Sequence, residues 1–381
     1  MRLAVYTDYS YRRETGGVWA ERAFALFLGG LAERVGSLTV LGRLDPRPGE
    51  ARYRLPDAIR FVALPYYESL ARPGEALAAM ARSVAAFWRT LGEVDAIWLL
   101  GPHPLAIAAA LLAAMRRRRV FLGVRQDLPA YVNARHPDRR ALRLAGWGLD
   151  AAFRLLARFC PTVVVGPALA HRYAAASRLL ETTVSLVPDA AVADPQEAVA
   201  RNEEGGARTI LSVGRLEAEK TPLVLAEVLA RLAGAGGDWR LAVYGEGPLE
   251  SALASRLAEL GVAERAELRG YAHHGELQRA YREASLLLHS SATEGFPQVI
   301  VEALAAGLPV VASDVGGIRD AVGEAVMLVP SGDAEGAAAA LSQLADDPQE
   351  RRRRVEAGLR WARAHTEEAE LARLADFLRA A

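Results

Sequence analysis

The chain has 381 residues, of which 51% are hydrophobic and 24% charged, and its formal net charge at pH 7 is zero. This composition excludes intrinsic disorder and indicates a globular protein with a large core, and the length favours two domains. The first residues lack the apolar region of a signal peptide, and no apolar run reaches the ~20 residues of a membrane-spanning helix. Cys160 is the only cysteine, which excludes an internal disulfide and a cysteine-based metal site. The expected location is the cytoplasm.

The charges are divided unequally along the chain. Residues 1–195 carry 26 Arg against 17 Asp and Glu, a net charge of +9, and the remainder has a net charge of −9. A basic half facing an anionic partner explains this division, and so does attraction between two domains of opposite sign. Nucleic acid is not expected as a partner, because no recognition motif accompanies the arginines.

Short apolar, β-branched runs alternate with longer helical stretches, which is typical of βαβ units and parallel sheets. In the first half we expect strands at 2–7, 37–42, 59–64, 95–100, 119–124, 162–166 and 183–188. The pattern restarts with strands at 208–214, 239–245, 266–270, 285–290, 308–313 and 325–330, and the chain closes with helices at 333–346, 349–364 and 367–380.

The sequence therefore predicts an α/β protein with two Rossmann-like, doubly wound lobes that face each other across a cleft. The first domain is expected at 1–192, a polar linker at 193–207 and the second domain at 208–365. In such sheets, ligands bind at the carboxyl ends of the strands.

One helix of the first domain has an unusual basic side. In the expected helix 137–159, one side carries Arg140, Arg143, Trp147, Arg154 and Arg158, and the other side is apolar. Such a side suits peripheral contact with the inner face of a membrane or an anionic glycan. The favoured interpretation is simpler: the apolar side packs on the sheet and the arginines lie in water.

The stretch GRLEAEKTP (214–222) contains Lys220, the only lysine of the chain. An expected strand ends at Gly214, Arg215 and Lys220 follow in a short loop, and Thr221 is expected to cap the next helix. Two cations beside a helix N-terminus form an anion site. A solvated loop with two surface cations is the alternative.

Two later loops occupy the same topological position. In YGEGPLE (244–250), Gly245 lets the backbone approach a ligand closely. In SSATEGFPQVIVEALAAG (290–307), Glu294 lies in the loop and Glu302 lies inside the helix that follows. Carboxylates accept hydrogen bonds from the vicinal hydroxyls of a ribose or a hexose, and backbone N–H groups near Phe296 would face a phosphate.

Together, the motifs G-R-L-x₄-K, G-x-G-P-L-E, L-x-G-Y and E-G-F-P-x₄-E-A-L-A-x-G-x-P-V-V-A-S-D-V-G-G resemble the retaining glycosyltransferases of family 4, which have the GT-B fold. The resemblance is dense over 208–330. Near the N-terminus it is looser: the strand LAVYTD is followed by Gly16 and Gly17, which are expected to open a helix. The terminal helix, 366–381, is expected to pack back on the first domain, as in that fold.

The resemblance implies a nucleotide-diphosphate-sugar donor, without a tightly bound cofactor or a metal. Arg215 and Lys220 would bind the diphosphate and stabilise the leaving group. Glu302 would hold the ribose hydroxyls, and Glu294 would lie against the transferred sugar. The other donor-binding residues implied are Gly16, Gly17, Gly214, Gly245, Tyr271, Gly295, Phe296 and Pro297.

The chain departs from the family after the strand 119–124, where members often have a histidine. Arg125 and Asp127 stand there instead and are candidates for the acceptor side. Asp127 and His103 are also catalytic candidates, and His103 serves equally well as a packing residue at a helix start. Retaining transfer needs no protein base where the leaving phosphate takes the acceptor's proton.

We therefore expect a retaining hexosyltransferase of glycan biosynthesis that uses a UDP- or GDP-sugar and a glycan, lipid-linked or small-molecule acceptor. The alternatives are a nucleotide-sugar epimerase on the same fold and a non-catalytic nucleotide-sugar-binding relative. An NAD-dependent oxidoreductase is disfavoured, because neither half opens with G-x-G-x-x-G after its first strand.

Overall fold

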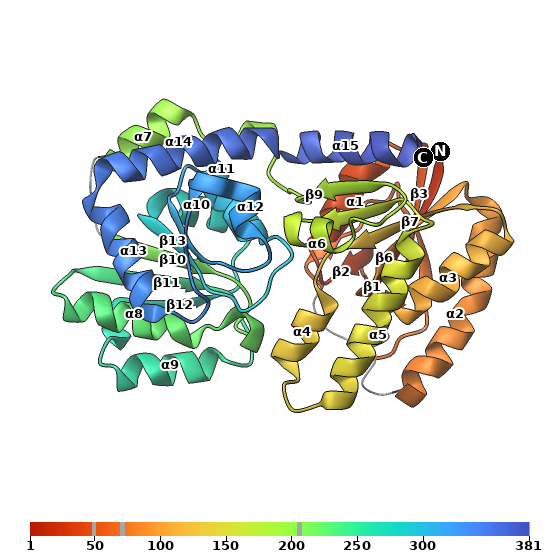
Figure 1. Ribbon diagram of the computed structural model, residues 1–381, viewed down its shortest axis with the longest axis horizontal. Coiled ribbons are helices and arrows are strands. Elements are labelled where there is room, and N and C mark those ends of the chain that lie inside the picture. The colour runs from red at the N-terminus through yellow and green to blue at the C-terminus, as the bar shows by residue number, and fades with distance from the viewer. Residues whose placement is uncertain (48–50, 69–72, 204–207, 381) are drawn as a thin grey trace. The chain divides into compact units, whose positions relative to one another are not determined.

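The computed structural model describes residues 1–47, 51–68, 73–203 and 208–380. The chain divides into two compact units: Met1–Leu186 with Glu367–Ala381 form the first, and Val187–Thr366 form the second. Each unit is built on a largely parallel sheet with helices around it, so the predicted α/β class is confirmed (Figure 1). Within the described ranges, no helix combines the length and the apolar character needed to cross a bilayer.

The first unit has a sheet in the order β4-β2-β1-β6-β7-β8-β9, with β3 pairing with β1 and β5 pairing with β3. The strands are β1 Arg2–Glu14, β2 Gly17–Ala20, β3 Ser37–Leu44, β4 Tyr53–Arg54, β5 Arg60–Leu64, β6 Ala96–Gly101, β7 Arg119–Val124, β8 Thr162–Val165 and β9 Leu179–Thr182. The helices are α1 Phe24–Ala32, α2 Pro73–Glu93, α3 Pro104–Met115, α4 Leu128–Arg135, α5 Arg140–Ala157, α6 Pro167–Arg172 and α15 Glu367–Arg379.

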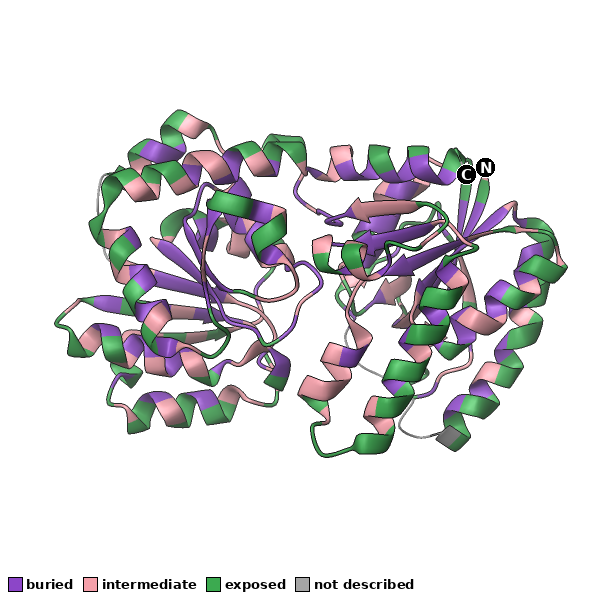
Figure 2. Ribbon diagram, in the orientation of Figure 1, coloured by how far each residue is buried: buried purple, intermediate pink, exposed green. Residues whose placement is uncertain are grey.

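Two groups of helices cover the two faces of this sheet. α2, α3 and α5 share one core cluster with the strands, to which Phe87, Ala106 and Phe153 contribute. On the opposite face, Phe377 of α15 lies 6.3 Å from the ring of Phe121. Figure 2 shows the strands buried and the outer sides of the helices exposed.

The second unit has a fully parallel sheet in the order β12-β11-β10-β13-β14-β15. Its strands are β10 Arg208–Val213, β11 Trp239–Tyr244, β12 Ala266–Gly270, β13 Leu286–His289, β14 Val310–Ser313 and β15 Val326–Val329, where the sequence predicts them. Its α-helices are α7 Pro195–Glu203, α8 Leu223–Gly234, α9 Glu250–Glu259, α10 His274–Glu283, α11 Gln298–Ala305, α12 Ile318–Val322, α13 Ala334–Asp346 and α14 Pro348–Ala364. Short 3₁₀ turns lie at η1 Asp189–Ala191, η2 Ala218–Lys220, η3 Ala263–Arg265 and η4 Gly323–Ala325.

The prediction of a strand at 183–188, the last one expected in the first half, is wrong. No strand forms over 183–188, and β9 lies just before that segment. Val184 has a φ of 54°, a left-handed conformation that a β-branched residue rarely adopts and that ends the strand. The carboxylate of Glu370 holds the chain at this point, because it accepts hydrogen bonds from Thr182 Oγ1 at 2.6 Å and Thr183 N at 3.3 Å. These bonds also attach α15 to the first unit.

The expected linker 193–207 is also corrected. Its described part contains α7, which packs against α14 through Ala198, Val199, Val355 and Leu359, and residues 204–207 lie outside the described residues. The helix start is readable in the sequence: Asp194 Oδ1 accepts a hydrogen bond from Gln196 N at 2.9 Å, and a proline occupies the first turn. The boundary between the units falls after Leu186 instead.

Gly16 and Gly17 do not open a helix. β1 continues to Glu14 and forms an antiparallel hairpin with β2, so the two glycines lie at the hairpin turn, and α1 begins only at Phe24. The aromatic residues of the YSYRRE segment favour an extended strand. A φ of 95° explains the glycine at position 16.

Candidate active site

Three loops at the carboxyl ends of β10, β11 and β12 are joined by backbone hydrogen bonds. Gly214 N donates to Tyr244 O at 2.9 Å, and Gly245 N donates to Gly270 O at 2.7 Å. A Cβ atom on Gly245 would lie 1.8 Å from the carbonyl oxygen of Gly214. The glycine at 245 is therefore required for one loop to pack on another, whereas the sequence predicted that it admits a ligand.

The turn that carries Lys220 is held by the segment that directly follows β13. Ser290 Oγ donates to Lys220 O at 3.0 Å, and Ser291 Oγ donates to Glu219 O at 3.0 Å. Thr221 then adopts a left-handed φ of 43°, so it does not cap α8 as expected, and Pro222 takes that position. A β-branched residue in this conformation stores strain, which commonly accompanies functional loops.

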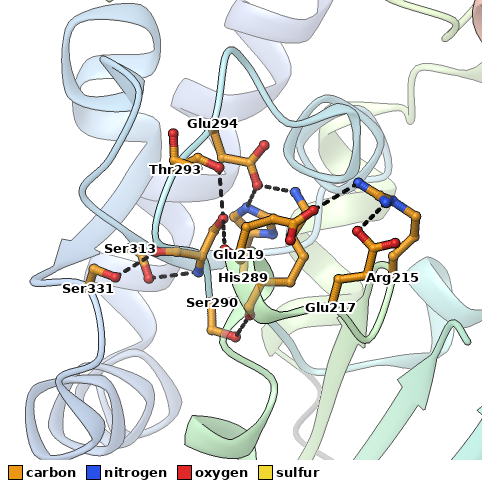
Figure 3. Close-up of polar contacts among 11 residues, drawn as sticks. Arg215, Glu217, Glu219, His289, Ser290, Thr293, Glu294, Ser313 and Ser331 are labelled. Atoms are coloured by element: carbon orange, nitrogen blue, oxygen red, sulfur yellow. Dashed lines mark hydrogen bonds and ion pairs between the residues drawn. The ribbon is translucent and has the colours of Figure 1, made fainter. Parts of the chain in front are cut away.

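His289 and Glu294 lie next to one another (Figure 3), and Lys220 joins them in one largely buried polar group. Lys220 Nζ is paired with Glu294 Oε1, and His289 Nε2 lies 3.0 Å from the same oxygen. Only 10% of the Glu294 side chain and 20% of the Lys220 side chain are exposed. Burial alone would raise the pKa of Glu294, but the Lys220 ammonium and the His289 hydrogen bond lower it to about 2. Glu294 is therefore an anion throughout the physiological pH range.

Arg215 lies beside this group and faces two carboxylates. Its Nη1 is paired with Glu217, and its Nη2 lies 3.3 Å from Glu219 Oε1. Burial, together with the neighbouring Glu217, raises the pKa of Glu219, while Arg215 opposes the rise. A diphosphate would have to compete for both cations, and protonation of Glu219 would make Arg215 easier to release.

A pocket opens between these residues, with Gly214, Arg215, Lys220, Pro222 and His289 among its lining. Two cations beside the start of a helix are features with which proteins bind anionic phosphate. The structure therefore brings Gly214, Arg215 and Lys220 of one loop together with Glu294 of another.

Glu302 lies on α11 beside a second pocket, which Val187, His274, Tyr281 and Arg282 also line. The Tyr281 hydroxyl donates to Glu302 Oε2 at 2.7 Å. Burial raises the pKa of Glu302 to about 6, although this hydrogen bond opposes the rise. The second carboxylate of the motif therefore titrates near neutrality, unlike Glu294.

The backbone between the two glutamates is positioned by side chains that point into the core. Phe296 is 6% exposed and its ring lies 5.4 Å from the ring of Trp361, so its side chain packs in the core. Gly295 precedes it, and Pro297 is the N-cap residue of α11. A Cβ atom on Gly316 would lie 2.4 Å from the carbonyl oxygen of Glu294. The sequence analysis missed this constraint from the D-V-G-G segment.

Tyr271 lies directly after β12, with its ring 5.3 Å from that of His273. His289, Glu217, Glu219 and Tyr281 also belong to the site, and sequence reasoning missed them. His289 offered a signal, because it ends a buried strand next to the Glu294 loop.

In the first unit, His103 lies inside a hydrogen-bond network and is 3% exposed. Its Nδ1 accepts from Leu105 N at 3.1 Å, so Nε2 carries the proton of the neutral ring and donates to the Tyr67 hydroxyl at 2.8 Å. Tyr67 in turn donates to Asp8, and Tyr6 lies 2.9 Å from Nδ1. Burial lowers the pKa of His103. The side chain therefore caps α3 and supports Asp8, and it does not itself lie at the surface.

We expect replacement of His103 with alanine to destabilise the protein by about 3 kcal/mol, because a helix cap is lost and buried hydroxyls lose a partner. Asparagine retains the cap, so His103→Asn should lose clearly less. Urea unfolding of both variants measures the difference. Equal losses in the two variants would contradict the capping role.

Arg125 and Asp127 follow β7, as predicted, and both have partners within the first unit. Arg125 Nη1 donates to the Tyr9 hydroxyl at 2.6 Å, and its guanidinium lies 4.0 Å from the centroid of the Phe24 ring. Asp127 caps α4 by accepting from Ala130 N at 3.0 Å. Both side chains therefore contribute to the local structure at this edge of the sheet.

The family model described as Glycosyl transferases group 1 matches residues 194–361. The chain is 31% identical over 249 residues to the 2-deoxystreptamine glucosyltransferase of Streptomyces kanamyceticus, which covers 63% of each chain. It is 38% identical over 154 residues to the D-inositol 3-phosphate glycosyltransferase of Thermobispora bispora, over 37% of this chain and 36% of that relative. Each of these relatives is thus matched over less than two thirds of its own length.

Solved structures are similar over the whole chain. Sucrose-phosphate synthase from Thermosynechococcus elongatus superposes with a TM-score of 0.75 at 19% identity, covering 100% of this chain and 98% of that one. Anabaena Alr3699/HepE, solved in complex with UDP-glucose, has a TM-score of 0.71 at 16% identity and full coverage of both chains. These likenesses show the fold. The chain has the GT-B fold, and its residues 194–361 match the family model of the group 1 glycosyl transferases.

Proposed function

We propose that the protein is a retaining glycosyltransferase of family 4, which moves a hexosyl group from a UDP- or GDP-sugar to a glycan, lipid-linked or small-molecule acceptor. The observation that carries this proposal is the buried group of Lys220, Glu294 and His289, with Arg215 beside it, at the carboxyl edge of the sheet. Support comes from a structural neighbour, Alr3699/HepE, which holds UDP-glucose in one structure and UDP with glucose in another.

In the proposed reaction, the bond between the sugar C1 and the diphosphate oxygen breaks, and a bond from C1 to the acceptor oxygen forms on the same face. The acceptor's proton passes to the leaving phosphate. Arg215 and Lys220 would neutralise the charge that builds on the diphosphate, as fixed cations do most effectively in a site that excludes water. Glu294, held as an anion, would accept hydrogen bonds from sugar hydroxyls.

The remaining donor contacts are proposed from the motif. Glu302 would hold the ribose hydroxyls, and Tyr271 would meet the base through its main chain. Backbone groups at Gly214, Gly245 and 295–297 would line the phosphates and the sugar, with Gly16 and Gly17 contributing from the first unit. The nucleotide sugar would be a substrate, without a resident cofactor or metal.

For the acceptor side we retain Arg125 and Asp127 as candidates, with the network of His103 acting indirectly through Asp8. A cytoplasmic location without a nucleic-acid partner is also proposed. The cytoplasmic location agrees with the single cysteine of the chain, because disulfides are rare in cytosolic proteins.

We expect nucleotide affinity to depend on pH through Glu302. Its pKa of about 6 means that the carboxylate is progressively protonated as pH falls below 6. A protonated carboxyl offers fewer acceptor sites to the ribose, so the Kd for UDP should rise about tenfold between pH 7.5 and 5. Calorimetry with Glu302→Gln supplies the control, because that variant retains every other titration, including those of Glu219 and of UDP itself. An equal change of the Kd for UDP with pH in wild type and Glu302→Gln would contradict the role of Glu302.

Product analysis tests the reaction class. Incubation with UDP-glucose or GDP-mannose and a panel of sugars, polyprenyl phosphates and small alcohols should give a glycoside whose anomeric configuration matches that of the donor. Conversion of the donor without any acceptor into a free sugar and nucleotide, or into an epimer, would indicate the epimerase instead. Binding without conversion under all conditions would indicate a non-catalytic relative.

A further inference from the structure

The outward sides of α2, α3 and α5 expose an unusual number of large apolar side chains. Of the eleven large hydrophobic residues that are exposed in the described part of the chain, nine lie on these helices or directly after α5. The most exposed are Phe159 at 76%, Leu144 at 72% and Met115 at 71%. The three helices pack side by side on one face of the sheet (Figure 1). We call the outward side of these helices, with residues 116–119 and 158–159, the apolar–basic face.

The exposed apolar side chains of α5 do not belong to the side of the helix that packs on the core. Its inner side is satisfied by Gly146, Phe153 and Ala157, which are buried. At 100° per residue, Leu144 and Leu155 point in nearly the opposite direction, and both are more than half exposed. As the favoured interpretation expects, the inner side of this helix packs on the sheet and Arg140, Arg154 and Arg158 are exposed. The solvent side of α5 combines arginines with an apolar ridge.

The charges on this face have one dominant sign. α3 carries no charged residue, and the single acidic residue of α5, Asp150, is 1% exposed and paired with Arg172. The exposed acidic residues of α2 lie near its two ends, at Glu75 and Glu93. Residues 116–119 are four consecutive arginines, and the guanidinium of Arg116 lies over the Trp88 ring at 3.9 Å.

We propose that the apolar–basic face binds the surface of an anionic lipid bilayer. Leucine, phenylalanine and methionine side chains would enter the interface between headgroups and acyl chains, while the long arginine side chains reach the lipid phosphates. α5 spans 18 residues, or about 27 Å, so its ridge would lie in the membrane plane. Two copies of this face would bring arginines against arginines, which disfavours self-association as the reason for the exposed side chains.

Vesicle binding tests this inference without any donor, so its outcome is independent of the proposed transfer reaction. Wild-type protein should co-sediment with phosphatidylcholine vesicles that contain about 30% phosphatidylglycerol. It should not bind vesicles of phosphatidylcholine alone, and raising the salt from about 50 to 300 mM should weaken binding to the anionic vesicles.

Substitutions on the face should act without unfolding the protein, since the side chains are exposed. Leu155→Ser with Phe159→Ser should lower the bound fraction about tenfold, and Arg140→Gln with Arg158→Gln should weaken the salt dependence, since the arginines at 116–119 remain. Leu26→Ser is the matched control, because Leu26 is 45% exposed on α1 and should bind as the wild type does. Failure of the wild type to bind anionic vesicles, or equal binding by the Ser pair, would overturn the proposal. A wild-type dimer that the Ser pair converts to a monomer, with no vesicle binding, would assign the face to a second copy instead.

Discussion

Replacement of Lys220 with alanine is expected to lower kcat/KM for sugar transfer by about 10²- to 10³-fold, because a fixed cation that faces the leaving diphosphate is lost. The same change leaves Glu294 buried without its ammonium partner. Breaking a buried pair in this way costs about 3 kcal/mol of stability. The lower kcat/KM and the lower stability have one origin, because the Lys220 side chain, which is 20% exposed, both faces the pocket and pairs with Glu294.

Two further variants separate the chemical role of Lys220 from its structural role. Lys220→Met combined with Glu294→Gln removes both charges, so it should recover most of the stability that Lys220→Met loses, while activity stays low. Lys220→Arg keeps the charge but replaces a compact ammonium with a planar fork, and we expect an intermediate rate. An arginine variant as fast as the wild type would show that the only lysine of the chain has no special role.

Replacement of Glu294 with glutamine is expected to destabilise the protein by about 3 kcal/mol at pH 7, from the difference between an ordinary pKa of 4.5 and the folded value of about 2. A depressed carboxyl pKa stabilises the folded state above pH 4.5, and that stabilisation is lost as pH falls toward 2. The difference in free energy of unfolding between wild type and variant should therefore shrink to about half by pH 3. Transfer should also slow, because the amide cannot accept as many hydrogen bonds from the sugar.

Urea unfolding of the two proteins between pH 7 and pH 3 measures that difference. Glu350→Gln is a useful control: arginines on its own helix also lower the pKa of Glu350, but it lies on α14, away from the motif loops. It should change stability without changing the transfer rate. A difference in free energy of unfolding between wild type and Glu294→Gln that does not change with pH would contradict the buried ion pair.

Much of the second unit could be predicted from the sequence, since its strands are apolar, β-branched runs that are buried in a parallel sheet. The motif residues Arg215, Lys220 and Glu294 could be placed near one another because the carboxyl ends of parallel strands share an edge. Their pairing could not be predicted. It depends on the left-handed turn at Thr221, and on Ser290, which holds the turn across the sheet.

The first unit was harder to predict because tertiary contacts override local patterns there. The run 183–188 is apolar enough for a strand, but Glu370, far away in the sequence, fixes it in another conformation. The glycines at 16 and 17 suited a helix start by analogy, whereas the long β1 strand needed a hairpin turn there. The exposed leucines of α5 could not be foreseen, because helical periodicity alone does not reveal which leucines the sheet covers.

A thermal-shift panel with UDP, GDP and ADP tests directly whether the loop with Lys220 binds the diphosphate of a nucleotide. We expect one of them to raise the Tm of the wild type by several degrees at a concentration about 100-fold above its Kd. The same nucleotide should shift Lys220→Ala much less. If no nucleotide raises the Tm of the wild type, or if Lys220→Ala responds as strongly, binding of the diphosphate by this loop is contradicted.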